Sequence, residues 1–166
     1  EDALIGATAI EKTRNPLPEQ TLNLCLNTDA VLFGAIGNPK YDNNPEAKIR
    51  PEQGLLKLRK ELGLYANIRP IKPFKNLLDA SPIKKEVIEN VDFVIFRELT
   101  GGSYYGEKVI NEEGTFASDI CEYSENEINR ITNQAFKAAQ GRRKKVTLVD
   151  KANVLETSRL WRKIVK

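Results

Sequence analysis

Continuous apolar runs alternate along the chain with stretches in which apolar residues recur every three or four positions. Ala30–Ile36 is an unbroken apolar run of strand length, which favours a strand buried on both faces of a parallel sheet. The apolar runs at 91–96 and 146–150 predict two more strands, and residues 3–10 predict a strand that leads into a loop. Strands that alternate with helices predict an α/β architecture.

The clearest helical pattern in the first half of the chain begins at Pro51, a residue suited to a first helical turn, and runs to about Gly63. At 100° per residue its side chains form two neighbouring stripes. One stripe is the expected core side and the other an open edge with acidic, apolar and basic groups. The first contains Leu55, Leu58 and Leu62, and the second contains Glu52, Leu55, Leu56 and Arg59.

The strongest helix start in the second half is Ser124, which forms a capping box with Glu127. The pattern then continues to Gly141, a residue that favours a helix end. The apolar face of this helix is Ile128, Ile131, Ala135 and Ala138. Further helices are predicted around 22–26, at 83–88 after Ser81-Pro82, and from near Glu156.

Residues 103–123 predict a long β-hairpin that turns near Asn111–Gly114. The hairpin has few apolar residues to bury by itself. Because an isolated two-stranded hairpin is marginally stable in water, we expect this arm to cover a partner surface.

Composition narrows the class of protein further. The 166 residues include 26 basic and 23 acidic side chains, and the net charge of +3 favours neither a nucleic-acid nor a membrane partner. The basic run at 142–145 lies after a predicted helix end, where positive charge is favourable. Cys25 and Cys121 lack metal-site spacing and predict two reduced thiols in a cytoplasmic protein.

Two residue types are missing. The absence of histidine removes the usual general base and the commonest metal ligand. The absence of methionine, including at position 1, leads us to expect that the chain is a piece of a longer protein.

Three arginines stand out as candidate anion ligands. Arg59 lies on the predicted helix, Arg69 on the extended segment that follows, and Arg97 directly after the predicted strand 91–96. Arginine binds carboxylates through a planar two-pronged fork. Arginines near the adjacent pair Leu55-Leu56 therefore suit a small polyacid with a hydrocarbon branch.

Lys151 also directly follows a predicted strand, and ligands of open α/β sheets collect beyond strand carboxyl ends. A lysine with a lowered pKa can act as a general base. Tyr104 or Tyr105, beside Gly101-Gly102, is the candidate acid. The alternative interpretation is structural: a solvated strand end or an ion pair for the cations, and packing within the hairpin for the tyrosines.

Four segments together carry a family resemblance, and they occur in the family's order over nearly the whole chain. They are VLFGAIGNPKYDNNP, RPEQGLLKLRKELGLYANIRP, RELTGGSYYGE and VDKANVLETSRLWRK. They resemble the isocitrate/isopropylmalate dehydrogenase family of decarboxylating β-hydroxyacid dehydrogenases. The GLLKLRK helix resembles the isopropylmalate branch, since isocitrate enzymes carry a polar, serine-containing sequence there.

The resemblance implies NAD-dependent oxidative decarboxylation of 3-isopropylmalate to 2-oxoisocaproate in leucine biosynthesis, assisted by Mg²⁺ or Mn²⁺. It implies that Arg59, Arg69 and Arg97 bind the substrate carboxylates. It also implies that Leu55 and Leu56 contact the isopropyl group.

The same resemblance implies further roles near the reacting atoms. Glu52 and Asn153 would lie near the nicotinamide of NAD. Tyr104 would protonate the enolate, and Lys151 would take the hydroxyl proton. In the family, the lysine and asparagine complete the site of the neighbouring subunit.

The resemblance also implies an incomplete α/β fold with a protruding β-hairpin arm. Residues 1–64 would be part of a first domain that binds cofactor and substrate, and 65–166 most of a second, dimer-forming domain with the arm at 103–123. The family's metal-binding aspartates would lie outside this chain, so we expect these 166 residues alone to be inactive.

Two alternatives remain open at the level of sequence. One is a sister dehydrogenase acting on another malate, such as tartrate or homoisocitrate. The other is a non-catalytic dimerisation module that retains the arm and the second domain.

Overall fold

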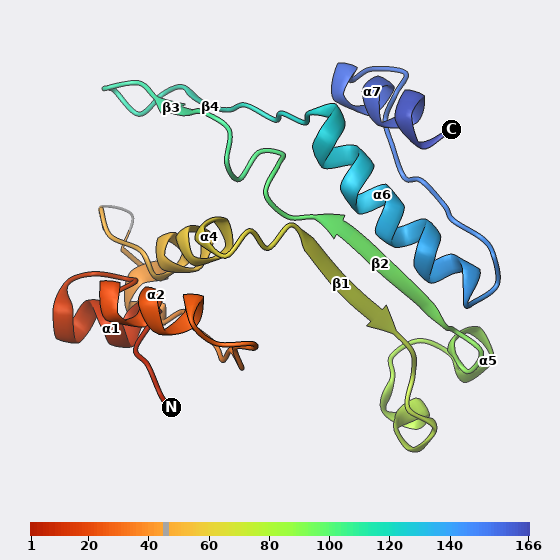
Figure 1. The fold of residues 1–166 in the computed structure, drawn as a ribbon, viewed down its shortest axis with the longest axis horizontal. Helices are drawn as coiled ribbons and strands as arrows, with labels where there is room; N and C mark the ends of the chain where they lie inside the picture. Colours follow the sequence, from red (N-terminus) through yellow and green to blue (C-terminus); the bar gives the residue numbers. More distant parts are fainter. Residues whose placement is uncertain (45–46) are drawn as a thin grey trace. The chain divides into compact units, whose positions relative to one another are not determined.

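The chain forms two compact units, Glu1–Leu64 and Tyr65–Lys166, in a computed structural model that describes residues 1–44 and 47–166 (Figure 1). The first unit is built from helices and loops in its described part. The second unit combines helices with two antiparallel strand pairs. Among residues 1–44 and 47–166, no helix combines the length and apolarity needed to cross a bilayer.

The described residues of the first unit form four helices: α1 (Gly6–Thr13), α2 (Glu19–Leu26), α3 (Pro39–Asp42) and α4 (Pro51–Glu61). The predicted short helix around 22–26 is thus confirmed as α2. The core of the first unit contains Leu17, Cys25 and Leu58, with Ile5, Leu22 and Leu62 packed against them. This small cluster fixes one side of α4 and leaves its other side for the candidate site.

Helix α4 follows the prediction closely at both ends. Pro51 is in the first turn, and the Gln53 side chain accepts a hydrogen bond from the Arg50 N–H at 3.0 Å. Gly63 ends the helix in the left-handed region at φ 64°. Gly54 allows close packing, because a Cβ built there would lie 2.4 Å from the Pro16 carbonyl oxygen.

Two strand predictions in the first unit are wrong. Residues 3–10 were predicted as a strand, but Gly6–Thr13 form α1, whose buried residues Ala7, Ala9 and Ile10 follow helical spacing. Ala30–Ile36 has no strand structure, and Leu32 is fully exposed at 103%. A strand needs hydrogen-bonding neighbours, and no strand of the described residues pairs with this run.

The second unit is organised around strands β1 (Ala66–Ile71) and β2 (Phe93–Glu98), which pair antiparallel. Helix α6 (Glu125–Gln140) lies along β2, and α7 (Glu156–Val165) packs against α6 (Figure 1). Ile128 and Ile131 of α6 are almost completely buried. The link from β1 to β2 contains the 3₁₀ helix η1 (Lys75–Ala80) and the single-turn helix α5 (Lys85–Ile88).

The predicted capping box of α6 is confirmed. The Ser124 N–H donates to a Glu127 carboxylate oxygen at 2.7 Å, and the Ser124 hydroxyl oxygen accepts from the Glu127 N–H at 3.3 Å. Gly141 is the C-cap, and the predicted final helix is confirmed as α7.

The hairpin is made of β3 (Lys108–Ile110) and β4 (Ala117–Asp119), which pair antiparallel. Its turn lies where the sequence predicts. The Asn111 side chain accepts hydrogen bonds from the N–H groups of Thr115 and Phe116, at 2.8 and 2.9 Å. Ile110 and Phe116 are exposed at 70% and 61%, so apolar surface of the hairpin is uncovered in the described chain.

Three expectations for the second unit need correction. The helix predicted at 83–88 is only Lys85–Ile88, because the Ser81 hydroxyl accepts from the Ile83 N–H in a local turn instead of capping a longer helix. Residues 146–150 do not form a strand, and Val149 is 91% exposed. The strand pairs found are antiparallel, although a parallel sheet was expected from Ala30–Ile36.

Candidate functional site

The register of β1 and β2 places two predicted anion ligands on one face. Asn67 lies opposite Arg97, and Arg69 lies opposite Ile95. Directly opposite residues of an antiparallel pair share a face, and residues two positions apart along a strand share it too. Arg69 and Arg97 are therefore diagonal neighbours on the same face. The Arg69 Nε–H donates to the side-chain oxygen of Asn67, on the same strand and the same face, at 2.6 Å.

This face is the one that α6 leaves open. Glu98, which follows Arg97 and points to the opposite face, is buried against Arg130 of α6. Arg97 and Arg69 are exposed, as are Phe93 and Ile95. The open face thus combines two guanidinium groups with apolar surface. Arg97 lies inside β2, so the expectation that it follows the strand is wrong by two residues.

Tyr104 lies beside Arg97. The guanidinium carbon of Arg97 is 4.9 Å from the centre of the Tyr104 ring, in the range of a cation–π contact. Half of the Tyr104 surface is exposed, at 51%. The structure therefore brings together one predicted anion ligand and the predicted proton donor.

The turn that carries Tyr104 requires glycine. Gly102 has φ 78°, and a Cβ built there would lie 2.6 Å from the Tyr123 hydroxyl oxygen. The Gly102 N–H donates to the Glu122 carbonyl oxygen at 2.7 Å, and the Tyr123 ring packs edge-on against Trp161 of α7. Burial raises the pKa of the Tyr123 phenol above its ordinary value. The contact between the base of the hairpin and this turn was not predicted from sequence.

Lys151 lies in a turn that precedes α7, and not after a strand as expected. Its backbone N–H donates to the Ser158 hydroxyl at 3.1 Å, and its carbonyl accepts from Val154 and Leu155 at 3.0 Å each. The side chains of Lys151 and Asn153 are exposed. The predicted base and the predicted nicotinamide ligand thus share one ordered turn.

Asp150 anchors this turn to α7. Its carboxylate accepts two hydrogen bonds from the Arg162 guanidinium, at 2.6 and 3.1 Å, and one from the Ala152 N–H at 3.0 Å. The Arg162 hydrogen bond lowers the pKa of the Asp150 carboxyl below its ordinary value. In return, Asp150 raises the pKa of Arg162. This pair was not predicted from the sequence, because it depends on how the turn folds back onto α7.

The remaining predicted site residues lie in the first unit, on α4. Glu52 is exposed, and Leu55, Leu56 and Arg59 are half-buried. Leu55 was expected in the core stripe, but it lies outside the core cluster around Leu58. The predicted site residues therefore form one group on α4 and a second group in the second unit.

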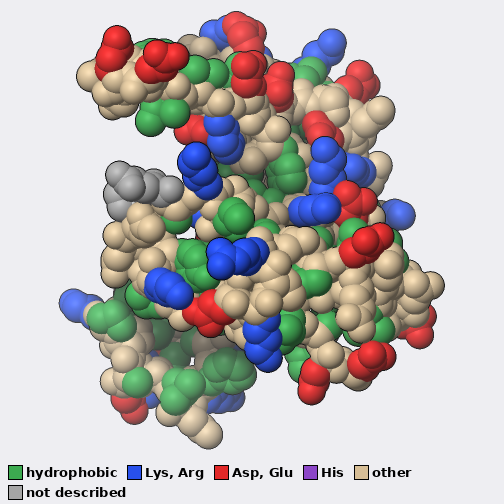
Figure 2. All heavy atoms as spheres, turned by 90° about the vertical axis from the view of Figure 1, so that its left-hand side faces the viewer, with side chains coloured by type: hydrophobic (Ala, Val, Ile, Leu, Met, Phe, Trp, Pro, Cys, Tyr) green, Lys and Arg blue, Asp and Glu red, His purple; other side chains and the backbone are tan. Residues whose placement is uncertain are grey.

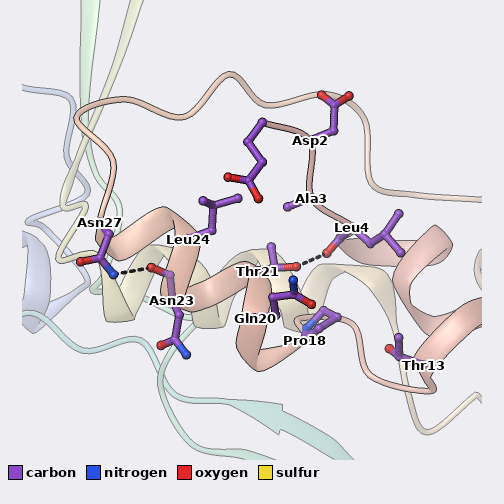
Figure 3. Close-up of a pocket in the computed structure, with 11 residues that line it drawn as sticks. Asp2, Ala3, Leu4, Thr13, Pro18, Gln20, Thr21, Asn23, Leu24 and Asn27 are labelled. Carbon is purple, nitrogen blue, oxygen red and sulfur yellow. Dashed lines mark hydrogen bonds between the residues drawn. The ribbon is translucent and has the colours of Figure 1, made fainter.

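A pocket of about 490 Å³ lies elsewhere in the first unit (Figure 3). It is lined by the N-terminal residues, Thr13, Pro18 and residues of α2, and the Thr21 hydroxyl donates to the Leu4 carbonyl at 2.8 Å beside it. It contains none of the predicted site residues.

Within residues 1–44 and 47–166, no cluster of three or more His, Cys, Asp or Glu side chains is arranged to hold a metal ion. Basic and acidic side chains both lie on the face drawn in Figure 2, with hydrophobic side chains exposed between them.

Arg69 and Arg97 on one exposed face, with Tyr104 beside Arg97, form a surface that can bind a carboxylate. The chain belongs to the isocitrate/isopropylmalate dehydrogenase family, whose model matches residues 1–166. It is 55% identical over 170 residues to a 3-isopropylmalate dehydrogenase of Bacillus subtilis (strain 168), which covers 100% of this chain and 46% of that protein.

Two further matches cover similar shares of the chains. A 3-isopropylmalate dehydrogenase of Aquifex aeolicus (strain VF5) is 53% identical over 168 residues, covering 99% of this chain and 46% of that protein. An isocitrate dehydrogenase structure from Methylococcus capsulatus matches with a TM-score of 0.72 and 30% identity, over 97% of this chain and 45% of that one. The chain thus spans about half the length of the curated relatives that it matches.

Proposed function

We propose that this chain is part of a dehydrogenase that oxidises and decarboxylates 3-isopropylmalate to 2-oxoisocaproate in leucine biosynthesis. The proposal depends above all on one observation, the open face on which Arg69 and Arg97 are neighbours and Arg97 contacts Tyr104. Relatives that are 52–55% identical and named 3-isopropylmalate dehydrogenase support the choice of substrate.

On this proposal, Arg69 and Arg97, together with Arg59, bind the two carboxylates of the substrate. Fixed positive groups reduce the cost of the negative charge that develops when a carboxylate leaves as CO₂. A carboxylate on Arg97 lies near the Tyr104 phenol, since the guanidinium and the ring are in contact. Leu55 and Leu56 contact the isopropyl branch, and their half-buried positions on α4 leave apolar surface for it.

Proton transfers are assigned to two side chains. The Lys151 amine takes the proton of the substrate hydroxyl as the hydride leaves the same carbon. After loss of CO₂, the Tyr104 hydroxyl gives its proton to the enolate carbon. The ordered turn around Lys151 and the glycine-dependent turn before Tyr104 support these roles, because proton transfer requires positioned groups.

Glu52 and Asn153 are the residues proposed to contact the nicotinamide of NAD, which would supply the hydride acceptor. A carboxylate and an amide suit that polar ring edge, and both side chains are exposed. A divalent metal, Mg²⁺ or Mn²⁺, would supply polarisation of the substrate oxygens. The described residues offer no cluster of ligands for it, so we assign no step of this chain to a metal.

We further propose that residues 1–64 contribute to a cofactor and substrate domain and 65–166 to a dimer-forming domain. The exposed apolar side chains of the hairpin, Ile110 and Phe116, support an arm that covers a second copy. Two unpaired cysteines, Cys25 and Cys121, agree with a protein of the cytoplasm.

The test is an activity assay of a full-length protein that contains this chain. We expect NADH formation with 3-isopropylmalate, NAD and Mg²⁺ or Mn²⁺, and much slower reaction with tartrate, homoisocitrate or isocitrate. Preference for one of those acids would replace the proposed substrate. No turnover of any of them by a folded dimer would favour the non-catalytic dimerisation module.

A paired substitution tests the substrate pocket. Replacing Leu55 and Leu56 with polar residues should weaken use of isopropylmalate more than use of unbranched malate, by roughly tenfold per lost apolar contact. Lys57→Gln, at an exposed position of the same helix, is the matched control. Equal losses for both acids would contradict the pocket assignment.

A further inference from the structure

Glu98 is the charged side chain most deeply buried in the described part of the chain, at 3% exposure of the residue and 1% of the side chain. It directly follows Arg97 in β2. A carboxylate next to an anion-binding arginine would compete with the substrate for that arginine if the two lay on the same face. Alternation along the strand places them on opposite faces.

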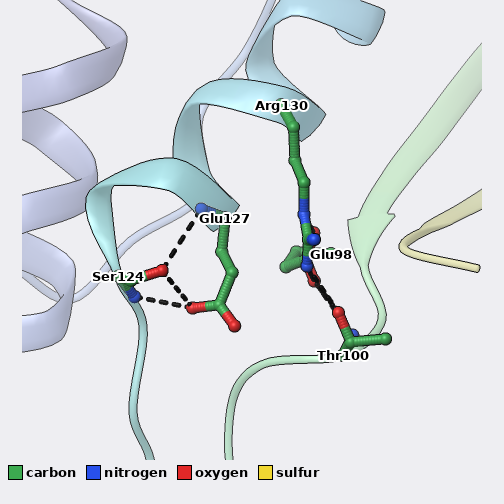
Figure 4. A network of polar contacts seen from close by, with 5 residues as sticks. All are labelled: Glu98, Thr100, Ser124, Glu127 and Arg130. Carbon is green, nitrogen blue, oxygen red and sulfur yellow. Dashed lines mark hydrogen bonds and ion pairs between the residues drawn. The ribbon is translucent and has the colours of Figure 1, made fainter. Parts of the chain in front are cut away.

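Arg130 of α6 holds the Glu98 carboxylate on the buried face (Figure 4). Arg130 Nη2 is 2.7 Å from one carboxylate oxygen and Nε is 3.2 Å from the other, a two-pronged arrangement. The Thr100 N–H and hydroxyl donate to the same carboxylate at 2.9 and 2.8 Å. All these bonds converge at the end of β2, where the chain leaves the strand for the turn of Tyr104.

Arg130 is itself fixed. Its guanidinium carbon lies 4.7 Å from the centre of the Tyr65 ring, and the Tyr65 hydroxyl accepts a hydrogen bond from Gln134 at 3.0 Å. Tyr65 directly precedes β1, and its carbonyl accepts from the Leu99 N–H at 2.8 Å. The pair thus ties α6 to the ends of both strands of the open face.

We propose that Glu98 and Arg130 are positioning residues that orient Arg97 and Tyr104 for the substrate. The proposal rests on the function proposed above. Arg130 neutralises Glu98 on the buried face and so leaves Arg97 available for the substrate carboxylate. The hydrogen bonds that Thr100 donates to Glu98 fix the first residues of the turn that leads to Tyr104.

The test compares Glu98→Gln and Arg130→Lys with Asp92→Asn in a full-length protein that contains this chain. Asp92 bonds to Arg142 just beyond the other ends of β2 and α6, so the control weakens a contact between the same elements far from Arg97. We expect the positioning variants to raise the KM for 3-isopropylmalate about tenfold or more. The KM for NAD should change by less than about twofold, and Asp92→Asn should leave both nearly unchanged.

A double-mutant cycle tests whether Glu98 affects the substrate KM through Arg97. If Glu98 acts through Arg97, then Glu98→Gln added to Arg97→Lys should raise the substrate KM little further. Full additivity of the two substitutions would show a general loss of structure and would overturn the proposal.

A second readout does not depend on activity. In protein labelled with ¹³C-tyrosine, the Tyr104 ring signal, assigned with Tyr104→Phe, should shift in Glu98→Gln and stay in place in Asp92→Asn. An unchanged Tyr104 signal and an unchanged substrate KM in folded Glu98→Gln would overturn the inference. If Glu98→Gln fails to fold, Thr100→Val is measured in its place, because it removes the hydroxyl that bonds to Glu98 and Arg130 but keeps the ion pair between them. A wild-type protein that does not oxidise isopropylmalate would overturn the proposed function instead, and the ring signal would still decide this inference.

Discussion

At the residue scale, the neighbouring residues Arg97 and Glu98 of β2 point to opposite faces and make different contacts. Arg97 faces the open side with Arg69, and Glu98 faces α6, where Arg130 holds it. The same separation occurs around Lys151. Asp150 points to Arg162 of α7, and the exposed Lys151 side chain is free of that anchor. In both places an inward carboxylate fixes the backbone from which an outward cation extends.

Lys151→Met tests the proposed base in the full-length protein. We expect loss of oxidation with little change in the affinity for isopropylmalate, because methionine fills similar space but cannot take a proton. Turnover and the binding of isopropylmalate, by calorimetry, are the measurements. Lys163→Met, at an exposed position of α7, is the control. Near-normal turnover of Lys151→Met would remove this residue from the mechanism.

The stability of Asp150→Asn at different pH values tests the contact between Asp150 and Arg162. The Arg162 hydrogen bond lowers the pKa of Asp150 in the folded protein, so the ionised carboxylate stabilises the fold above the ordinary aspartate pKa. That contribution is lost as the pH falls through the lowered value. We expect Asp150→Asn to be less stable than wild type at neutral pH, with a difference that shrinks below about pH 4.

Urea unfolding of both proteins at several pH values measures this difference. The matched control is Asp119→Asn, which removes an exposed carboxylate of the hairpin paired with Lys108 at 3.4 Å. A stability gap between Asp150→Asn and wild type that widens towards acid would contradict the sign of the linkage.

The sequence predicted which side chains belong to the candidate site better than it predicted the contacts that position them. Arg69, Arg97 and Tyr104 were named from the sequence, and the structure adds their shared face and contact. Glu98 and Arg130 were missed, because they are 32 positions apart and their pairing depends on how α6 packs on β2. Such a contact leaves no short motif in a sequence.

At the scale of elements, helix ends were predicted correctly because they depend on nearby residues. Strands were predicted less well because they depend on distant pairing partners. Helices α4 and α6 begin and end near the predicted residues, since caps and glycine stops act within one turn. Ala30–Ile36 and 146–150 have the composition of strands, but no described strand pairs with either. Apolar composition alone does not supply the hydrogen-bonding partner that a strand requires.

The capping box of α6 gives a prediction at this scale. Ser124→Ala removes the acceptor for the Glu127 N–H, and we expect a loss of about 1 kcal/mol in the free energy of unfolding. Helix α6 covers Glu98, so this variant also tests whether weakening the helix start alone disturbs the site. Thermal unfolding and the substrate KM are the measurements. Ser118→Ala in β4 is the control, and equal stability of Ser124→Ala and wild type would show that the cap contributes nothing.

At the scale of the whole molecule, the described chain leaves much apolar surface uncovered. Val109, Ile110, Phe116 and Ile120 of the hairpin are all more than 40% exposed. A two-stranded hairpin gains little stability by itself, so a partner that covers these side chains would add most of it. The uncovered apolar surface of the hairpin supports the proposed dimer arm independently of the relatives' names.

Ile110→Asp with Phe116→Asp tests the arm in the full-length protein. Burying two carboxylates in an apolar contact is costly, so we expect the dimer to dissociate at concentrations where wild type remains dimeric. Sedimentation velocity over a range of concentrations measures this shift. Glu112→Gln with Glu113→Gln, in the exposed turn of the same hairpin, is the control. The family resemblance implies that Lys151 and Asn153 complete the site of the neighbouring subunit, so turnover should fall with the dimer fraction. A monomeric variant with full turnover would show that each subunit holds a complete site, and an unchanged dimer would show that the hairpin surface lies outside the interface.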